Sequence, residues 1–303
     1  MIFVNGIRYV LGESRPISSV PELGGDEAAI KFLADRGFKN YRHSQVEAWE
    51  LGVEAARQAM QAAEVNVADI DQVVYASVSS RTPAHGDLSI GLFAHRMEML
   101  TTPITGVCFG ECTNAMLGIE HAAMLLETGR ARTVLLVSTD VACSKEQRVT
   151  TGQTICSDGA AACVITREPR GSAVPSFELL AFAKAFHHLS RAGMSNPAKS
   201  FRDICAAAMR CKKTVLAKID KPLAKWIPNT ANSEVAGALA SVLGIPASMF
   251  YLDNLPEYAH VFSTDQLINL VDWATRSKAP SGSVVAGLAT GTSGSSVAAW
   301  RVV

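Results

Sequence analysis

The residue whose type and position most directly indicate chemistry is Cys112. It lies in the run GVCFGECTNAMLGIEHAAML, where a strand-like stretch at residues 104–108 meets a helical pattern that begins near Cys112. A thiol at the positive end of a helix dipole ionises more readily, and the thiolate is the nucleophilic form. The position predicts a nucleophile, although a free cysteine is also common as a small buried residue. Cys108 is the competing thiol, and its apolar neighbours Val107 and Phe109 predict a buried, inert side chain.

A histidine and a carboxylate five positions apart form the second candidate group. His260 precedes an amphipathic helical pattern in YLDNLPEYAHVFSTDQLINLVDWA, and Asp265 falls in the first turn of that helix. A carboxylate beside an imidazole fixes its tautomer and stabilises its protonated form, so the pair predicts acid–base chemistry. A turn histidine and a charge that stabilises a helix start would give the same pattern without chemistry.

Asn229 follows the strand-like residues 224–228 and precedes a helix that begins near Asn232 or Ser233. Open α/β sheets place ligand groups where strand ends face helix starts, so Asn229 is a candidate binding residue. The alternative is a turn asparagine or a helix cap.

A glycine-rich run, GLATGTSGSS at residues 287–296, connects two strand-like segments. Such a loop lets the backbone approach a ligand closely. The loop residues expected to do so are Gly291, Thr292, Ser293 and Gly294. The run lacks the Lys-Ser/Thr pair of a phosphate loop, and no G-x-G-x-x-G opens a helix, so nucleotide hydrolysis and dinucleotide binding have no support.

The elements that must position these residues follow an α/β pattern, with strand-length apolar runs alternating with helical segments. The pattern appears twice, on either side of a charged link at residues 167–175. The helix at 45–63 and the strand at 69–78 correspond to the helix at 200–217 and the strand at 224–228. The strands at 132–139 and 160–166 correspond to those at 283–288 and 296–303. We therefore predict an internal repeat, with one unit at residues 1–170 and another at 171–303.

Composition excludes several classes of protein. The 303 residues carry 28 basic and 28 acidic side chains, so the chain lacks the basic surface that nucleic-acid binding needs. Apolar runs fall far short of the roughly 20 residues of a membrane span, and no signal-peptide pattern opens the sequence, so we expect a cytosolic protein that has no membrane partner. Cys108 and Cys112 lack a second Cys or His pair at zinc spacing, so no metal site is expected.

Taken in order, these segments resemble the ketoacyl-ACP synthase III group of the thiolase superfamily. The segments are ECTNAMLGIEHAAMLLETGRARTVLLVSTD, ICSDGAAACVI, WIPNTAN, the His260 run and GTSGSSVAAWRV. The resemblance implies a thiolase-like, five-layered αβαβα fold of two similar halves and a homodimer whose interface includes residues 155–165. It also implies an acyl group carried on Cys112 and thioester substrates of coenzyme A or an acyl carrier protein, with no tightly bound cofactor.

Two departures from the family change the expected site. Where the family has histidine in a Pro-His-Gln-Ala-Asn run, this sequence has Asn229, and where the family has asparagine after Tyr-Gly, it has His260 after Tyr258 and Ala259. With Asp265, the set is similar to a branch that has a Cys-His-Asp or Ser-His-Asp triad. That branch serves as acyltransferases or starter-unit enzymes in polyketide and other natural-product pathways.

We therefore expect acyl transfer from a thioester through Cys112 to an acceptor, either a small molecule or a carrier-bound group. His260 is the expected base, Asp265 its partner, and Asn229 the residue that orients the acyl carbonyl. Backbone N–H groups near Cys112 and in the loop at 291–294 are expected to hold the oxyanion. Two alternatives stay open: decarboxylative condensation with a malonyl thioester, in which Asn229 and a neutral His260 act as donors, and a non-catalytic dimer partner with the same fold.

Overall fold

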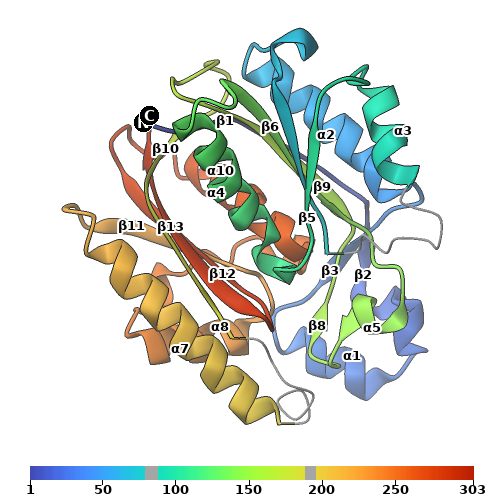
Figure 1. Ribbon diagram of the computed structural model, residues 1–303. Helices are drawn as coiled ribbons and strands as arrows, with labels where there is room; N and C mark the ends of the chain where they lie inside the picture. The colour runs from blue at the N-terminus through green and yellow to red at the C-terminus, as the bar shows by residue number, and fades with distance from the viewer. Residues whose placement is uncertain (79–87, 188–195) are drawn as a thin grey trace.

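The computed structural model describes residues 1–78, 88–187 and 196–303, and in these residues nine strands form one continuous sheet (Figure 1). Five strands come from the first half: β1 (Phe3–Leu11), β9 (Gly159–Thr166), β6 (Thr133–Asp140), β4 (Gln72–Ala76) and β5 (Ile104–Val107), in that spatial order. Four come from the second: β10 (Phe177–Phe186), β13 (Gly294–Val302), β12 (Val284–Thr290) and β11 (Leu223–Pro228). The halves join where β1 pairs with β10.

The two halves repeat one arrangement. In the first, β1 is antiparallel to β9, β9 is antiparallel to β6, and β6 is parallel to β4. In the second, β10, β13, β12 and β11 follow with the same sequence of directions. The predicted repeat is confirmed, and β5 is the strand that has no counterpart among the described residues of the second half. The division into units 1–170 and 171–303 stays a prediction, because the sheet runs through both.

The major helices form three layers around the sheet (Figure 1). α2 (Ala48–Ala62) and α3 (Leu88–Arg96) share an apolar cluster with the first half, and α7 (Pro197–Leu216) and α8 (Ser233–Leu243) share one with the second. Between the two halves lie α4 (Asn114–Glu127) and α10 (Asp265–Arg276), in a cluster that draws on strands of both. The predicted five-layered αβαβα fold is confirmed.

Smaller elements complete the described chain. The helices are α1 (Glu27–Ala34), α5 (Lys145–Arg148) and α9 (Leu255–Tyr258). Two strand pairs lie outside the large sheet: β2 (Glu13–Pro16) with β3 (Asn40–His43), and β7 (Val149–Thr150) with β8 (Thr154–Ile155). Short 3₁₀ turns are η1 (Ile17–Ser19), η2 (Pro21–Leu23), η3 (Val67–Asp69), η4 (Glu111–Thr113), η5 (Ala247–Met249) and η6 (Phe262–Thr264). None of the helices in these three described ranges has the length and apolar character of a membrane span.

The two central helices pack closely, each for a reason visible in its sequence. Gly118 lets α4 approach β6, because a Cβ there would lie 2.7 Å from Leu136 Cδ1. In α10, the polar residues of the amphipathic pattern are buried and hydrogen-bonded instead of facing solvent. Gln266 donates to the carbonyl of Leu288 at 3.1 Å, and Asn269 accepts from Asn254 at 2.8 Å.

The structure corrects the expected position of residues 155–165. Most of this run forms β9, which lies between β1 and β6 with every residue buried inside the chain. A strand bonded on both edges cannot pair with a second copy. The interface assignment for this run is therefore wrong.

Candidate active site

The turn that carries Cys112 joins β5 to α4. Gly110 fits where a Cβ would lie 2.6 Å from Thr113 Oγ1, and its N–H donates to Asn114 Oδ1 at 2.8 Å. Thr113 Oγ1 donates back to the Gly110 carbonyl at 2.6 Å. These bonds fix η4, so Cys112 lies two residues before the start of α4, close to the helix start as predicted. Within the described residues, the N–H of Cys112 has no hydrogen-bond acceptor.

The structure brings together the three residues predicted as a triad. Cys112 Sγ lies 3.2 Å from His260 Nε2, and His260 Nδ1 lies 2.5 Å from Asp265 Oδ2. Asp265 also accepts from the N–H groups of Val261 and Thr230, each at 2.8 Å. His260 and Asp265 are 5% and 2% exposed, so the carboxylate is held on three sides away from water.

The backbone of His260 is fixed from a different part of the chain. Its N–H donates to the carbonyl of Ile155 at 3.0 Å, and its carbonyl accepts from Ser157 at 2.8 Å. Cys156, between them, is a second thiol next to the site; unlike Cys112 it is fully buried, and burial raises its pKa to about 11. The thiol of Cys156 is therefore protonated at neutral pH and is not in the nucleophilic thiolate form.

Burial and two neighbouring side chains act on the pKa of His260. Burial by itself lowers that pKa, since the interior disfavours a charged imidazolium. The charges of Asp265 and of Cys112 act in the opposite direction and outweigh burial, so the pKa lies well above its ordinary value. The resting site therefore favours the imidazolium form of His260.

Asn229 lies at the end of β11, as expected for a residue that faces a helix start. Its Oδ1 accepts from the N–H of Thr290 at 2.6 Å, which fixes the amide plane. Its Nδ2 is buried and has no hydrogen-bond partner among the described residues. Asn232, and not Asn229, caps α8, with its side chain accepting from Val235 at 2.7 Å. Asn229 is thus a positioned donor with an unused hydrogen.

Known proteins are similar to this chain in sequence over one segment and in fold over its whole length. Residues 109–181 match the family model of 3-oxoacyl-[acyl-carrier-protein (ACP)] synthase III. ChlB3, described as an acyltransferase, superposes with a TM-score of 0.82 at 18% identity, over 100% of this chain and 98% of its own. FabH, the 3-oxoacyl-(acyl carrier protein) synthase III of Pseudomonas aeruginosa, gives 0.79 at 19% identity, over 99% and 98%. Residues 109–181 are thus similar in sequence to the ketoacyl synthase III family, and the whole chain shares the fold of these proteins.

A further similar structure is OleA of Xanthomonas campestris with bound cerulenin, which gives a TM-score of 0.81 at 16% identity, over 99% of this chain and 97% of its own. No curated protein matches the sequence significantly. Because these identities are low, the structural matches establish the fold of this chain and not its chemistry.

The glycine-rich loop contacts η4, the turn that carries Cys112, and the sequence did not indicate this contact. The N–H of Gly291 donates to the Gly294 carbonyl at 2.8 Å, and the N–H of Thr292 donates to Glu111 Oε2 at 2.6 Å. Both amides are taken in this conformation, so neither is open to an oxyanion. The hydroxyl groups of Thr292 and Ser293 also reach the Glu111 carboxylate. The loop is therefore a support of the turn that carries Cys112.

Glu111 is the most informative residue that the sequence reasoning missed. Its backbone has φ +52°, a left-handed conformation that is uncommon outside glycine. Its carboxylate compensates with the bonds to Thr292 and Ser293. A charged residue directly before the candidate nucleophile was the available signal, but its partners lie about 180 positions away in sequence.

A buried ion pair supports the strand beside His260 and was also missed. Arg148 and Asp158 are 3% and 0% exposed and lie 2.8 Å apart. Arg148 also donates to the Cys156 carbonyl at 2.7 Å, and Asp158 accepts from the N–H groups of Ser44 and Ala142. The pair holds residues 155–158, which in turn fix the backbone of His260.

The surroundings of the Cys108 thiol differ in part from the prediction of a buried, inert side chain. It is half-buried, and Phe109 beside it is 92% exposed, so the predicted apolar enclosure is absent. The bond to His260 is made by Cys112. In the described ranges, no three His, Cys, Asp or Glu side chains converge as metal ligands do.

Proposed function

We propose that this protein is an acyltransferase that accepts an acyl group from a coenzyme A or acyl-carrier-protein thioester onto Cys112 and passes it to an acceptor nucleophile. The continuous contact from Cys112 Sγ through His260 to Asp265 supports this proposal most directly. A histidine backed by a buried carboxylate serves a reaction in which a proton must be taken from an acceptor. The ChlB3 acyltransferase shares the fold, which is consistent with the same class of reaction.

In the first half-reaction, the sulfur of Cys112 attacks the thioester carbonyl carbon. The open N–H of Cys112 is placed to donate to the developing oxyanion. The bond from the carbonyl carbon to the donor sulfur breaks, and the departing thiolate takes the proton that His260 holds. The products are acyl-Cys112 and the free donor thiol.

Acylation changes the charge around His260. An acyl-Cys112 thioester is neutral, so one of the two charges that raise the pKa of His260 disappears. The pKa of His260 therefore falls when the acyl-enzyme forms. The imidazole can then act as the base that the second half-reaction requires.

In the second half-reaction, Nε2 of His260 takes the proton of an alcohol, amine or thiol acceptor while the acceptor atom attacks the acyl carbon. Asp265 stabilises the imidazolium, and the tetrahedral adduct collapses to release Cys112. The unused Nδ2 hydrogen of Asn229 orients the acyl carbonyl. By resemblance to the triad branch, we place the reaction in the biosynthesis of polyketides or other secondary metabolites.

One observation favours a second candidate, decarboxylative condensation with a malonyl thioester. The Nδ2 of Asn229 and the Nε2 of His260 are two hydrogen-bond donors, the number needed where enolate charge develops on a thioester oxygen. Asp265 has no required role in that mechanism. The effect of Asp265 on turnover therefore discriminates the two reactions.

We also propose that the protein is a homodimer, paired along β5. β5 bonds to β4 on one side, and none of the described residues extends the sheet beyond it. The opposite edge differs, since the segment after η5 covers β11 through a bond from Tyr251 to the Trp226 carbonyl. An exposed edge strand is a template for pairing with another chain, and Phe109 beside it is exposed. Light scattering tests this, and a monomer at micromolar concentration would contradict it.

Mass spectrometry of the intact protein tests the proposed function. Wild-type protein is mixed with a panel of acyl-CoAs, the adduct is located by peptide mapping, and alcohol, amine and thiol acceptors are then added. We expect an adduct on Cys112 that is lost on addition of a competent acceptor. Adducts that discharge only with malonyl thioester would instead establish condensation, and the absence of any adduct across the panel would favour a non-catalytic partner.

A further inference from the structure

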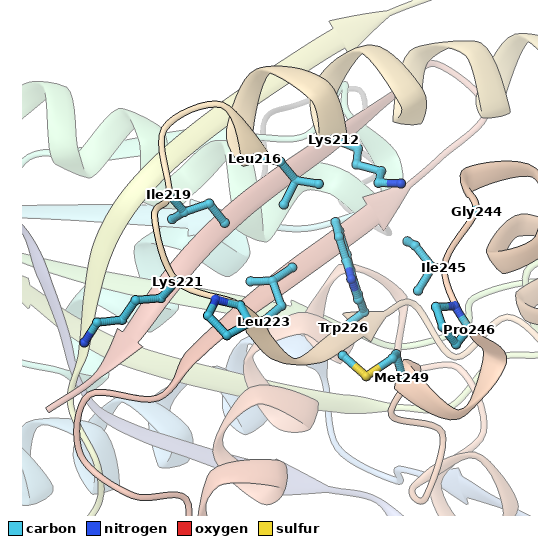
Figure 2. Close-up of a pocket in the computed structure, with 11 residues that line it drawn as sticks. Lys212, Leu216, Ile219, Lys221, Leu223, Trp226, Gly244, Ile245, Pro246 and Met249 are labelled. Atoms are coloured by element: carbon cyan, nitrogen blue, oxygen red, sulfur yellow. The ribbon is translucent and has the colours of Figure 1, made fainter.

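A cavity of about 320 Å³ opens on the second half of the molecule, away from the triad (Figure 2). It lies between the end of α7, the start of β11 and the segment that follows α8. β11 runs from this cavity at Leu223 to Asn229, and six strand residues span about 20 Å. The cavity is therefore separate from the site around Cys112.

The walls of the cavity are apolar. Trp226 is buried at its base, and the half-buried side chains of Leu216, Ile219, Leu223 and Met249 surround it. Figure 2 shows these side chains gathered around the indole, with the helix above and the turn that carries Met249 below. They are the part of the second-half core that remains open to solvent, so an apolar ligand would complete the packing.

The charges at the cavity have one sign. Lys212 and Lys221 line it, and no carboxylate does. Lys212 donates to the Leu243 carbonyl, while Lys221 is exposed and has no ion pair or hydrogen bond among the described residues. Figure 2 shows the two ammonium groups at opposite ends of the apolar wall. The surroundings are also basic, since residues 210–225 hold six Lys or Arg and one acidic residue, Asp220, in a chain with no net charge.

A second cavity, of about 730 Å³, shows the opposite pattern. It lies near the ends of α2 and α4 and is lined by side chains of both signs: Glu64, Asp69, Glu127, Glu168, Arg132, Arg167 and Arg170. Its charges compensate one another, and its lining selects no particular class of ligand. The 320 Å³ cavity, in contrast, combines an apolar wall with uncompensated positive charge.

We propose that this cavity binds a medium-chain aliphatic carboxylate. Its volume is at the lower end of the range for small-molecule sites and holds roughly ten groups of about 30 Å³ each. The chain lies on Trp226, Leu216 and Met249, and the carboxylate is held by Lys221 at the rim. The proposal is independent of the acyl-transfer function, because a free carboxylate is not a thioester donor.

Isothermal titration of the Cys112→Ala protein with octanoate tests the proposal without interference from acylation. We expect one octanoate per chain with a Kd in the high-micromolar to millimolar range, as for a ligand of about ten heavy atoms in an open cavity. Octanol, which lacks the charge, should bind more weakly by up to about fivefold. Acetate, which lacks the chain, should bind at least about tenfold more weakly.

Variants locate the binding. Lys221→Gln should weaken octanoate binding up to about fivefold, while Lys218→Gln, an exposed lysine of the same connection that does not line the cavity, should leave it unchanged. Leu216→Asp should weaken it tenfold or more, and Met249→Asp gives the same test where Leu216→Asp lowers the folded fraction. Octanoate binding that survives these variants, an equal affinity for octanol, or the absence of saturable binding would each overturn the proposal.

Discussion

The two halves of this molecule share the order and direction of four strands, but they place different side chains at the candidate site. In the first half, the turn before the central helix α4 carries the nucleophile candidate Cys112. In the second half, the turn before the central helix α10 carries His260, and α10 begins at Asp265. The repeat thus brings two helix starts to one point in the middle layer. Topology determines where the groups meet, and residue type determines which is the candidate nucleophile and which the candidate base.

The candidate nucleophile of the first half is a single atom, Sγ of Cys112, which a substitution by alanine removes. Cys112→Ala should abolish the acyl-enzyme, since no other described cysteine bonds to His260, while the small replacement leaves the fold intact. Intact-mass labelling with an acyl-CoA and thermal unfolding measure the two effects. Cys108→Ala is the matched control and should label as the wild type does. Undiminished labelling of Cys112→Ala at another residue would disprove the assignment.

The contribution of the second half should appear in a different step. Asp265→Asn keeps the size of the side chain and removes its charge, so acyl-Cys112 should still form while its discharge to the acceptor slows. In the serine-protease template the corresponding loss is about 10⁴ in rate, and this sets the upper expectation. Rapid-mixing measurement of each half-reaction separates the steps. Discharge at the wild-type rate to every acceptor would leave Asp265 as a charge at a helix start.

The pH dependence of discharge should sharpen this comparison. The rate should rise with pH as His260 loses its proton, because only the neutral imidazole is a base. Since Asp265 raises the pKa of His260, Asp265→Asn should move the midpoint toward acid, by one to three pH units for an adjacent opposite charge. His121→Gln, a histidine outside the triad, should leave the midpoint in place. An unchanged or more alkaline midpoint in Asp265→Asn would mean that another group titrates.

A smaller effect is expected when the contact between η4 and the glycine-rich loop of the second half is removed. Glu111→Ala removes the bonds to Thr292 and Ser293 and should slow acylation of Cys112 tenfold to a hundredfold, as misplacement of a reacting group by about 1 Å does. It should also lower the free energy of unfolding by about 1 to 2 kcal/mol.

The matched control for Glu111 is Glu120, which also joins the halves, through an exposed ion pair to Lys184. Glu120→Ala should change the free energy of unfolding by less than about 1 kcal/mol and leave acylation unaffected. Equal effects of the two substitutions on acylation would show that Glu111 acts only on stability.

Much of the fold followed from local pattern. The helix expected at 45–63 is α2, the helix expected at 200–217 is α7, and the strand expected at 224–228 is β11. Such elements are predictable because periodicity records which face of a segment is buried. The same signal does not state what covers the segment, which is why α10 has an amphipathic pattern and yet lies buried between two sheet halves.

The sequence by itself determined the candidate reactive groups: a cysteine before a helix, a histidine and carboxylate five positions apart, and an asparagine at a strand end. Tertiary structure alone decided that Cys112 meets His260 across 148 positions and that Glu111 meets Thr292 across 181. It also placed residues 155–165 in the interior and the unpaired edge at β5. The physical reason is that side-chain type and periodicity are local, whereas these contacts arise from the joining of two sheet halves around α4 and α10.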